Sequence, residues 1–323
     1  MKEREIAVTV SIITYCHEKY IRQCLDSVLS QETDFQFEVI VAEDASPDNT
    51  RQILLEYKQK YGDQLKLILH EKNVGPSANS ASIAAHVQGK YVAVVEGDDY
   101  WTDKYKLQKQ YDFLEKHPEY SAVCCDNMIV DSSGQIIQPQ SLDIQGDTVK
   151  TITDWQNEPY SIHTCTVFRR NIIPIDDPKY IKLRRDTPTM SDIIMFTLLY
   201  DYGPIYVMSD VMAAHRIAGI QDSSSFTIRN QKDPLKYTKL FIDIFSNIEA
   251  YFDHKYDFTK RKCIKVALTK TGKITRYYHY SGKEMRKITK LFPFRDRVYI
   301  HYLVLKELIN VMIKKISKIW STT

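Results

Sequence analysis

The architecture of this chain follows from one segment, Tyr91-Val92-Ala93-Val94-Val95-Glu96-Gly97-Asp98-Asp99-Tyr100-Trp101, in which a short apolar run ends in three carboxylates. A β-branched run of this length is typical of a buried strand. Open α/β sheets bind ligands outside the carboxyl ends of their strands, and Mg²⁺ and Mn²⁺ prefer carboxylate oxygens together with substrate phosphates. The segment therefore predicts a metal–diphosphate site at a strand end. Alternatively, Thr102 and Asp103 cap a helix over Lys104–His117, with Asp98 and Asp99 in a solvated loop.

Strand-like and helical segments alternate over the first 115 residues. Strands separated by helices of about a dozen residues imply right-handed βαβ crossovers and a mainly parallel sheet. The fold class is therefore α/β with a mainly parallel, twisted sheet of the nucleotide-binding type. GxGxxG and GxxxxGK[ST] are both absent from the sequence, which excludes a dinucleotide fingerprint and a P-loop. The expected strands are Ala7–Thr14, Glu38–Ala42, Leu65–Leu69 and Tyr91–Val95, and the expected helices are Glu18–Leu29, Asn49–Tyr61 and Ser77–Gln88.

The second half of the chain is less regular. Strands are expected at Ala122–Val130, Cys165–Arg169 and Ile205–Met208, with a helix over Ile193–Tyr202. From about Asn230 the pattern is helical, and the last helix, Val298–Trp320, has an apolar side flanked by lysines. A basic amphipathic helix of this kind fits an anionic membrane surface; packing on the body of the chain or dimerisation is the alternative.

Composition is typical of a soluble globular protein, with 43% hydrophobic and 26% charged residues among 323. The six cysteines have neither paired nor zinc-type spacing, which favours free thiols in a reducing compartment. The sequence shows no signal-peptide pattern and no apolar run of about 20 residues that would span a bilayer. We therefore expect a cytoplasmic protein, peripheral on the inner face of the cell membrane if the basic helices bind lipid.

Charge is distributed unevenly along the chain. Residues 255–323 carry 18 Lys+Arg and 4 Asp+Glu, whereas residues 1–254 carry 26 and 37. A nucleic-acid-binding protein would present a basic face as its working surface, so the acidic body argues against nucleic acid as a partner. The distribution fits an acidic catalytic body with a basic tail that meets an anionic surface.

Five short motifs follow one another along the chain: Val10-Ser11-Ile12-Ile13-Thr14-Tyr15-Cys16-His17, Leu25–Gln31, Glu43-Asp44-Ala45-Ser46-Pro47-Asp48, Asn73-Val74-Gly75 and Glu96-Gly97-Asp98. In this order and at this spacing they resemble the motifs of the family 2 glycosyltransferases of GT-A fold. The resemblance covers roughly Val8–Ser225. Cys16 stands where this family usually has Asn, Ala45 where it has Gly, and Glu96 where it has the first Asp of an Asp-x-Asp metal motif.

The resemblance implies a donor site for a nucleoside diphosphate sugar, with uridine the more usual base, and a Mn²⁺ or Mg²⁺ cofactor. Asp44 would accept a hydrogen bond from the base edge or act only as a turn-former, and Tyr15 would stack on the base or lie buried in its loop. Glu18 would touch the nucleotide or sit in the first turn of its helix. The implied donor residues are Thr14, Tyr15, Glu18, Asp44, Asn73, Gly75, Asp98 and Arg216, and the implied metal ligands are Asp98, Glu96 and His215.

The resemblance also places a general base just before the helix at Ile193. Ser191 stands where the first acid of the usual pair would be, so Asp192 is the candidate, with Asp186 as the fallback. An Asp before an apolar-periodic run is equally an N-cap, and both roles can hold together. Arg216 would clamp the diphosphate, and His215 would complete the metal shell or contact the phosphates.

Further candidates are less specific. The segment Gly219–Ser225 reads as a loop that orders over the donor or as a plain linker to the helices. Trp155 and His163 are candidate acceptor-site residues.

The sequence thus predicts an inverting, metal-dependent glycosyltransferase that moves one sugar from a nucleotide-sugar donor to a glycan or lipid-linked acceptor. We expect residues 1–117 to bind the donor, residues 118–228 to bind the acceptor and supply the base, and residues 229–323 to form a basic helical region. A non-catalytic nucleotide- or glycan-binding module at the membrane surface is one alternative. A sugar-phosphate nucleotidyltransferase is another, although Ser11–His17 lacks the Gly-rich basic loop such an enzyme would need.

Overall fold

The computed structural model describes residues 5–142, 144–157, 162–187, 191–217, 234–258, 290–292 and 297. Residue contacts divide the chain into two compact units, one formed by Met1–Trp155 and Ser161–Gly219 and the other by Gln156–Tyr160 and Ile220–Thr323. The strands of the described residues all lie in the first unit. In chain order the elements are β1 (Ile6–Thr14), α1 (Ile21–Leu29), β2 (Gln36–Glu43), α2 (Thr50–Tyr61), η1 (Gly62–Gln64), β3 (Leu65–Leu69), α3 (Pro76–Ala84), β4 (Tyr91–Glu96), β5 (Tyr100–Trp101), α4 (Lys106–Lys116), β6 (Ala122–Val130), β7 (Ile136–Gln138), β8 (Thr148–Lys150), α5 (Ile152–Asn157), η2 (Thr164–Thr166), β9 (Phe168–Arg170), α6 (Pro178–Asp186), α7 (Ser191–Tyr202), β10 (Ile205–Arg216) and α9 (Pro234–Tyr251).

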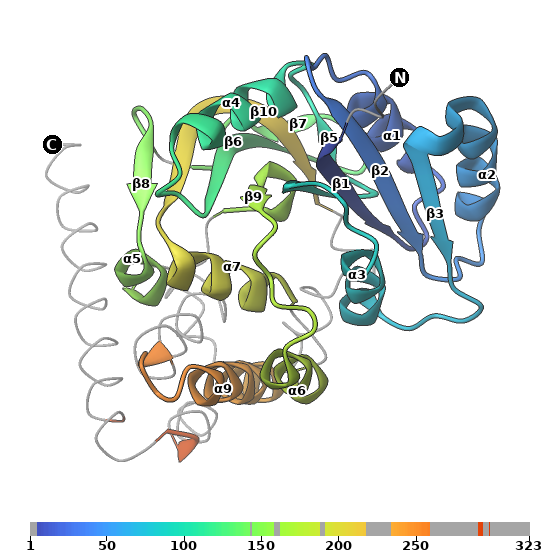
Figure 1. The fold of residues 1–323 in the computed structure, drawn as a ribbon. Helices are drawn as coiled ribbons and strands as arrows, with labels where there is room; N and C mark the ends of the chain where they lie inside the picture. Colours follow the sequence, from blue (N-terminus) through green and yellow to red (C-terminus); the bar gives the residue numbers. More distant parts are fainter. Residues whose placement is uncertain are drawn as a thin grey trace, which may run out of the picture. The chain divides into compact units, whose positions relative to one another are not determined.

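The strands form one mixed sheet (Figure 1). Its order is β3-β2-β1-β4-β9-β6-β10-β5, with β7 pairing with β6 and β8 with β10 at the side. β3, β2, β1 and β4 are parallel to one another, and β6 is parallel to β10. β9 runs antiparallel between β4 and β6. The predicted α/β class with a mainly parallel sheet is therefore confirmed.

Alternating side chains of the strands supply cores on both faces of the sheet. On β2, Val39 and Val41 belong to the larger core, which α1, α2 and α4 cover. Ile40 and Ala42 point to the other face and pack with Ile83 of α3. Figure 1 shows α4 on one side of the sheet and α3 and α7 on the opposite side. This period-2 alternation is the reason that a parallel strand buried on both faces reads as a continuous apolar run.

Several boundaries differ from the sequence prediction: α3 ends at Ala84 instead of Gln88, and β9 begins at Phe168 instead of Cys165, because Thr164–Thr166 form the 3-10 turn η2. Two further differences have identifiable reasons. α1 begins at Ile21 rather than at Glu18, because the carbonyl of His17 accepts hydrogen bonds from the backbone N–H groups of Tyr20 and Ile21 in a preceding turn. β10 continues to Arg216, eight residues beyond the predicted end at Met208. The register shifts between Met208 and Ala213, where Ser209 and Asp210 interrupt the apolar pattern. The sequence pattern therefore predicts a strand that ends too early.

The second unit contains α9, whose buried side chains recur at helical spacing. Phe241, Ile244, Phe245 and Ile248 are buried, and Phe245 stacks on Phe258 with ring centroids 6.0 Å apart. The predicted helix Val298–Trp320 and loop Gly219–Ser225 lie outside the described residues. Among the helices that the structure describes, none has the length and hydrophobicity to cross a membrane. Residues on both sides of the predicted boundary at 117 share one sheet, and the division into donor and acceptor parts remains a prediction.

Candidate active site

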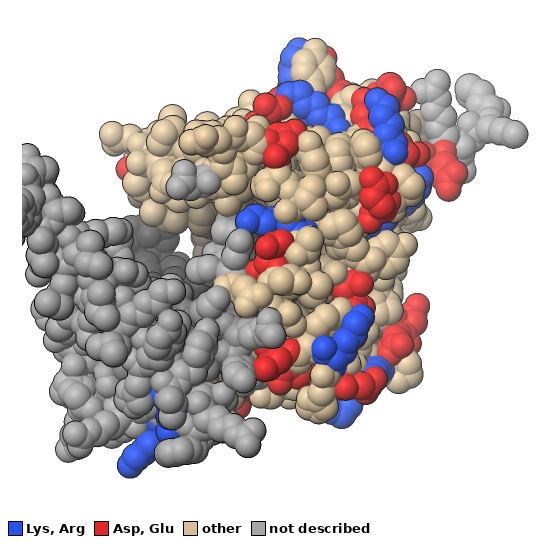
Figure 2. All heavy atoms as spheres, turned by 90° about the vertical axis from the view of Figure 1, so that its left-hand side faces the viewer, with Lys and Arg blue, Asp and Glu red and all other residues tan. Residues whose placement is uncertain are grey.

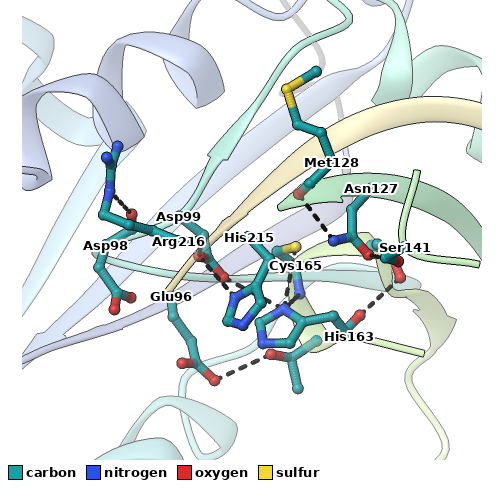
Figure 3. A network of polar contacts seen from close by, with 12 residues as sticks. Glu96, Asp98, Asp99, Asn127, Met128, Ser141, His163, Cys165, His215 and Arg216 are labelled. Atoms are coloured by element: carbon teal, nitrogen blue, oxygen red, sulfur yellow. Dashed lines mark hydrogen bonds and ion pairs between the residues drawn. The ribbon is translucent and has the colours of Figure 1, made fainter. Parts of the chain in front are cut away.

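The carboxyl ends of four parallel strands lie at one edge of the sheet. β1 ends at Thr14, β2 at Glu43, β4 at Glu96 and β10 at Arg216. Because β9 runs antiparallel to β4, the residues that precede β9 reach the same edge, and Oγ1 of Thr164 donates to Oε1 of Glu96 at 3.0 Å. This is the edge at which open α/β sheets bind ligands. Figure 3 shows the polar side chains that meet there.

Three carboxylates follow β4 at this edge. Oxygens of Glu96, Asp98 and Asp99 lie within 4.8 Å of one another. Burial, followed by the charges of Asp98 and Asp99, raises the pKa of Glu96 to about 8. Burial also raises the pKa of Asp99, although its hydrogen bond with His215 opposes the shift. Oδ1 of Asp98 and Oδ2 of Asp99 are buried without a hydrogen-bond partner among the described residues. Such unpaired acceptors are costly unless a proton, a water or a cation joins them.

Gly97 lets the acidic turn pack against the end of β1. A Cβ atom at this position would lie 2.6 Å from Oγ1 of Thr14 and 2.8 Å from Nδ1 of His17. Thr14 and His17 themselves are 3.2 Å apart through these atoms, and Nε2 of His17 lies 3.8 Å from Oδ2 of Asp98. The close approach therefore requires glycine, and it brings the predicted donor residue Thr14 against the acidic cluster.

Two histidines stack beside the acidic cluster. The rings of His163 and His215 are 3.5 Å apart between centroids and inclined by 28°. Nδ1 of His215 lies 3.2 Å from Oδ1 of Asp99, and Nδ1 of His163 lies 3.4 Å from Oδ2. Burial would lower the pKa of His215, but the hydrogen bond and charge of Asp99 raise it overall. Burial, with the nearby His215, lowers the pKa of His163 well below its usual range.

Arg216 is buried, and its N–H groups donate hydrogen bonds to other residues of the protein. Its backbone N–H donates to Oδ1 of Asp99 at 2.8 Å, and Nε donates to the carbonyl of Asp98 at 2.9 Å. Nη1 donates to the carbonyl of Asp131 at 3.1 Å, and Nη2 donates to Oε1 of Gln23 at 2.8 Å. The guanidinium therefore holds the acidic turn in place, and a contact with a diphosphate, as the sequence predicts, would require it to exchange one of these acceptors.

The predicted donor residues Asp44, Asn73 and Gly75 lie together at the end of β2. Oδ1 and Oδ2 of Asp44 accept hydrogen bonds from the backbone N–H groups of Val74 and Gly75 at 2.6 and 2.9 Å. Nδ2 of Asn73 donates to the carbonyl of Asp44 at 3.4 Å. Asp44 thus ties the loop that precedes α3 to the edge of the sheet. Each carboxylate oxygen can still accept one further hydrogen bond.

Tyr15 and Glu18 lie on the loop between β1 and α1. Tyr15 is 42% exposed, so its ring is free to meet a ligand. Oε2 of Glu18 accepts from the backbone N–H and the side-chain amide of Asn49 at 3.0 and 3.1 Å, so Glu18 caps the start of α2. Cys16 and Ala45 both have positive φ, 58° and 57°. These are the positions at which the resemblance expects Asn and Gly, the residues best suited to that conformation.

Asp192 lies in the first turn of α7, and its charge contributes to the raised pKa of Glu96. Two other candidates from the second half of the chain, Asp186 and Trp155, have structural partners elsewhere. Asp186 pairs with Lys182 and Arg185 on the surface of α6. Trp155 is buried and donates from Nε1 to Oγ1 of Thr197 at 3.0 Å, as a core residue does.

Sequence reasoning missed the position of His163. It lies 67 residues after Glu96, and no spacing rule connects the two segments. Only the antiparallel insertion of β9 beside β4 brings it to the edge where the parallel strands end. The hydrogen-bond partners of Arg216, Gln23 and Asp131, were missed for the same reason.

Comparison with known proteins identifies relatives of this chain. The sequence profile described as Glycosyl transferase family 2 matches residues 9–174. An uncharacterized protein of Mycobacterium tuberculosis is 44% identical over 117 residues, which is 36% of this chain and 34% of that protein. A Bacillus subtilis protein named provisionally as the teichuronic acid biosynthesis glycosyltransferase TuaG is 29% identical over 67% of this chain and 82% of its own length.

Solved structures show the same fold. S. aureus TarS 1–349 in complex with UDP-GlcNAc superposes with a TM-score of 0.63 at 20% sequence identity, covering 94% of this chain and 89% of that one. The match therefore confirms the predicted architecture. The chain aligns with only about a third of the length of the mycobacterial relative.

Proposed function

The chain belongs to glycosyl transferase family 2, and on that premise we propose that it transfers a sugar from a nucleoside diphosphate sugar to a glycan or lipid-linked acceptor with inversion. The observation that carries the proposal is the group of Glu96, Asp98 and Asp99 at the end of β4, among the ends of the other parallel strands. UDP is the nucleotide that the resemblance favours, and the TarS structure that shares the fold was solved with UDP-GlcNAc.

The acidic group fits a divalent cation. Asp98 and Asp99 each hold one buried oxygen without a hydrogen bond from the described residues, and a hard cation would satisfy both. Asp98 is the proposed direct ligand, with Glu96 and His215 completing the set. A Mg²⁺ or Mn²⁺ ion bound there would neutralise the charge that develops on the departing diphosphate.

The donor nucleotide is proposed to lie beside the loop that Asp44 holds. Asp44 keeps acceptor capacity for a base-edge N–H, and the exposed ring of Tyr15 is a stacking surface for the base. The backbone around Asn73 and Gly75 would line the same pocket. Thr14 packs against Gly97 and so supports the acidic turn. Glu18 acts on the nucleotide site indirectly. It caps α2 and so holds the loop that carries Asp44.

Asp192 is the proposed general base. It would accept the proton of the acceptor hydroxyl while that oxygen bonds to the anomeric carbon and the bond to the diphosphate breaks on the opposite face. The charge of Asp192 is a minor cause of the raised pKa of Glu96, after burial and the charges of Asp98 and Asp99, which supports a position within electrostatic reach of the acidic group. Its place in the first turn of α7 fixes the side chain at the start of a rigid element.

Arg216 is proposed to act mainly by holding Asp98 and Asp99 in position. A contact with the diphosphate, as the sequence predicts, is proposed as a second role, since a charge-assisted bond to phosphate would replace one of the bonds of Arg216 to a neutral acceptor.

The acceptor is proposed to be a surface polysaccharide or its lipid-linked precursor. The name of TuaG refers to teichuronic acid biosynthesis, and that relative spans most of this chain. Figure 2 shows basic and acidic side chains interspersed over the described part of one face. We also propose that the basic helical region contacts an anionic membrane. Most of its residues lie outside those described. The cytoplasmic location stays a prediction from sequence.

Thermal unfolding in the presence of nucleotides tests the proposal. Wild type and Asp98→Asn are compared with UDP, dTDP, GDP and CMP, each with and without Mn²⁺. A ligand at about 100 times its dissociation constant adds roughly 2.7 kcal/mol of stability. We expect UDP to raise the transition of wild type only with Mn²⁺, and Asp98→Asn to abolish the rise.

Asp210→Asn is the matched control, because Asp210 is an exposed carboxylate whose nearest cation is 3.5 Å away. It should behave as wild type does. If none of the nucleotides stabilises wild type with or without Mn²⁺, the donor-site assignment is wrong and a non-catalytic binding module becomes the better account. A nucleotide effect that survives in Asp98→Asn would leave the donor site but remove its metal.

A further inference from the structure

Arg169 is a buried arginine whose guanidinium has few hydrogen-bond partners. Its neighbour on β9, Arg170, faces α4 and donates at 2.7, 2.8 and 3.1 Å to three backbone carbonyls, those of Tyr120, Leu114 and His117. Neighbouring side chains of a strand alternate, so Arg169 points to the opposite face of the sheet, on which α3 and α7 lie (Figure 1). Its Nη1 donates to the carbonyl of Arg170 at 3.0 Å, whereas its Nε is buried without a hydrogen-bond partner.

The positive charge of Arg169 is also without a counter-charge. The residue is 7% exposed, and no carboxylate within the described part of the chain forms an ion pair with it. Burial lowers the pKa of Arg169 to about 10, and only the nearby Tyr180 opposes this shift. The guanidinium is therefore still protonated at neutral pH. Because a buried charge is costly unless it is paired, an anion bound here would supply a missing partner.

A second arginine and a phenol lie within reach of Arg169. The charges of Arg169 and Arg184 both act on Tyr180, which places the phenol within electrostatic range of two guanidinium groups. Tyr180 and Arg184 lie one turn apart on α6, and both are half-buried. Nη2 of Arg184 donates to the carbonyl of Ser77 in the first turn of α3. Two arginines and a tyrosine thus gather where the described residues provide no acid.

We propose that Arg169, Tyr180 and Arg184 form a binding site for a phosphate group. Guanidinium N–H groups match phosphate oxygens in geometry and form charge-assisted hydrogen bonds with them. The unpartnered Nε of Arg169 is one such donor, and the O–H of Tyr180 is a neutral one. Two positive charges favour a phosphate, which carries a charge of about −1.5 to −2 at pH 7, over a singly charged carboxylate.

This site is separate from the acidic group that follows β4. In the register of β9 and β4, Arg169 lies opposite Val92, four residues before Glu96. At about 3.3 Å per residue, this separation is roughly 13 Å along the strand. The inference therefore goes beyond the proposed function and does not need the chain to transfer a sugar.

Calorimetric titration of the full chain with inorganic phosphate tests the site, in chloride buffer without nucleotide or divalent metal. We expect wild type to bind one phosphate saturably. Arg169→Met should weaken binding by about tenfold or more, because a hydrogen bond between charged groups is lost. Arg185→Met is the matched control, since Arg185 is an exposed arginine of the same helix that pairs with Asp186. It should bind phosphate as wild type does.

A parallel titration with glucose 1-phosphate distinguishes two sources of the phosphate group. Tighter binding than that of inorganic phosphate would assign the site to a phosphorylated glycan. Weaker binding would assign it to free phosphate.

Urea unfolding provides a second readout. In chloride, Arg169→Met should be at least as stable as wild type, since the variant removes a buried charge without a partner. Phosphate should stabilise wild type more than Arg169→Met, beyond the general effect of the salt on both proteins.

The proposal would be overturned if wild type showed no saturable phosphate binding. Equal phosphate affinity in Arg169→Met would also overturn it. If that variant does not fold, equal affinity in Arg184→Gln has the same meaning, because the half-buried Arg184 is the second proposed contact. The proposed function fails separately, since its nucleotide effect is read with Mn²⁺ and this binding is read without nucleotide or metal.

Discussion

Nε of Arg216 donates a 2.9 Å hydrogen bond to the backbone carbonyl of Asp98, 118 residues earlier in the chain. The bond joins the last residue of β10 to the turn after β4. Both ends of the contact are partly buried, and the arginine is 5% exposed. The geometry of the acidic turn therefore depends on a side chain that the sequence places at the far end of the fold.

Replacing Arg216 by Lys should destabilise the protein by about 3 kcal/mol, because an ammonium cannot reach three acceptors in a plane and leaves the half-buried carbonyls of Asp98 and Asp131 without their donor. Urea unfolding at pH 7 measures the loss. The same variant should lose most of its Mn²⁺-dependent stabilisation by nucleotide, since the acidic turn is no longer held. Arg22→Lys, at an exposed arginine paired with Glu56, is the control and should leave the midpoint nearly unchanged. Equal midpoints for the two variants would contradict the positioning role.

Gly97→Ala should disrupt the contact between the acidic turn and β1. The added Cβ would lie 2.6 Å from Oγ1 of Thr14, which forces the turn or the strand end to move. Overpacking of this kind costs about 1–3 kcal/mol. We expect a lower urea midpoint together with weaker Mn²⁺-dependent nucleotide binding by calorimetry. Wild-type affinity in a folded Gly97→Ala protein would show that the turn can shift without consequence for the site.

Ala45→Gly should stabilise the protein. Ala45 has φ of 57°, a conformation that costs an L-residue about 1–2 kcal/mol, while glycine adds about 0.5–1 kcal/mol of unfolded-state entropy. A net gain of about 0.5–1 kcal/mol is expected in urea unfolding. Cys16→Asn, at φ of 58°, should act in the same direction for the same reason. Ala81→Gly, on the exposed side of α3, is the control. It should lower the free energy of unfolding by about 1 kcal/mol, whereas Ala45→Gly should raise it.

Lys106→Met should have an effect that depends on pH. Lys106 is fully buried, its Nζ contacts Oε1 of Gln110 at 2.6 Å, and burial lowers its pKa. Because the folded-state pKa lies below the unfolded value, wild type gains stability as pH rises through the folded pKa towards the unfolded one. At pH 7 the free energy of unfolding of the variant should therefore exceed that of wild type by between zero and about 2 kcal/mol. That advantage should shrink between pH 7 and pH 10.

Urea unfolding of Lys106→Met and wild type at several pH values measures this difference directly. Lys104→Met is the control, because Lys104 is exposed and paired with Glu32. Its difference from wild type should not shrink in the same way as pH rises. A gap between Lys106→Met and wild type that stays constant from pH 7 to pH 10 would show that Lys106 does not titrate in the folded protein.

Much of the fold could be predicted from local patterns. The apolar runs of β1, β2, β3 and β4 alternate with amphipathic helices, and this order is enough to imply a parallel sheet. The acidic group at the end of β4 followed from the same logic, because parallel strands end at one edge. β10 was predicted too short, since Ser209 and Asp210 interrupt the apolar pattern at the point where the register shifts.

The sequence by itself determined the alternating strands and helices of the first 115 residues and that Glu96, Asp98 and Asp99 follow a buried strand, because burial periodicity and strand ends are local properties. The tertiary structure alone decided that His163 stacks on His215, and that Arg216 reaches Gln23 and Asp131. These contacts depend on strand order and on the antiparallel insertion of β9 between β4 and β6. Pairing between distant segments is set by packing and register across the whole sheet, and no short stretch of sequence contains that information.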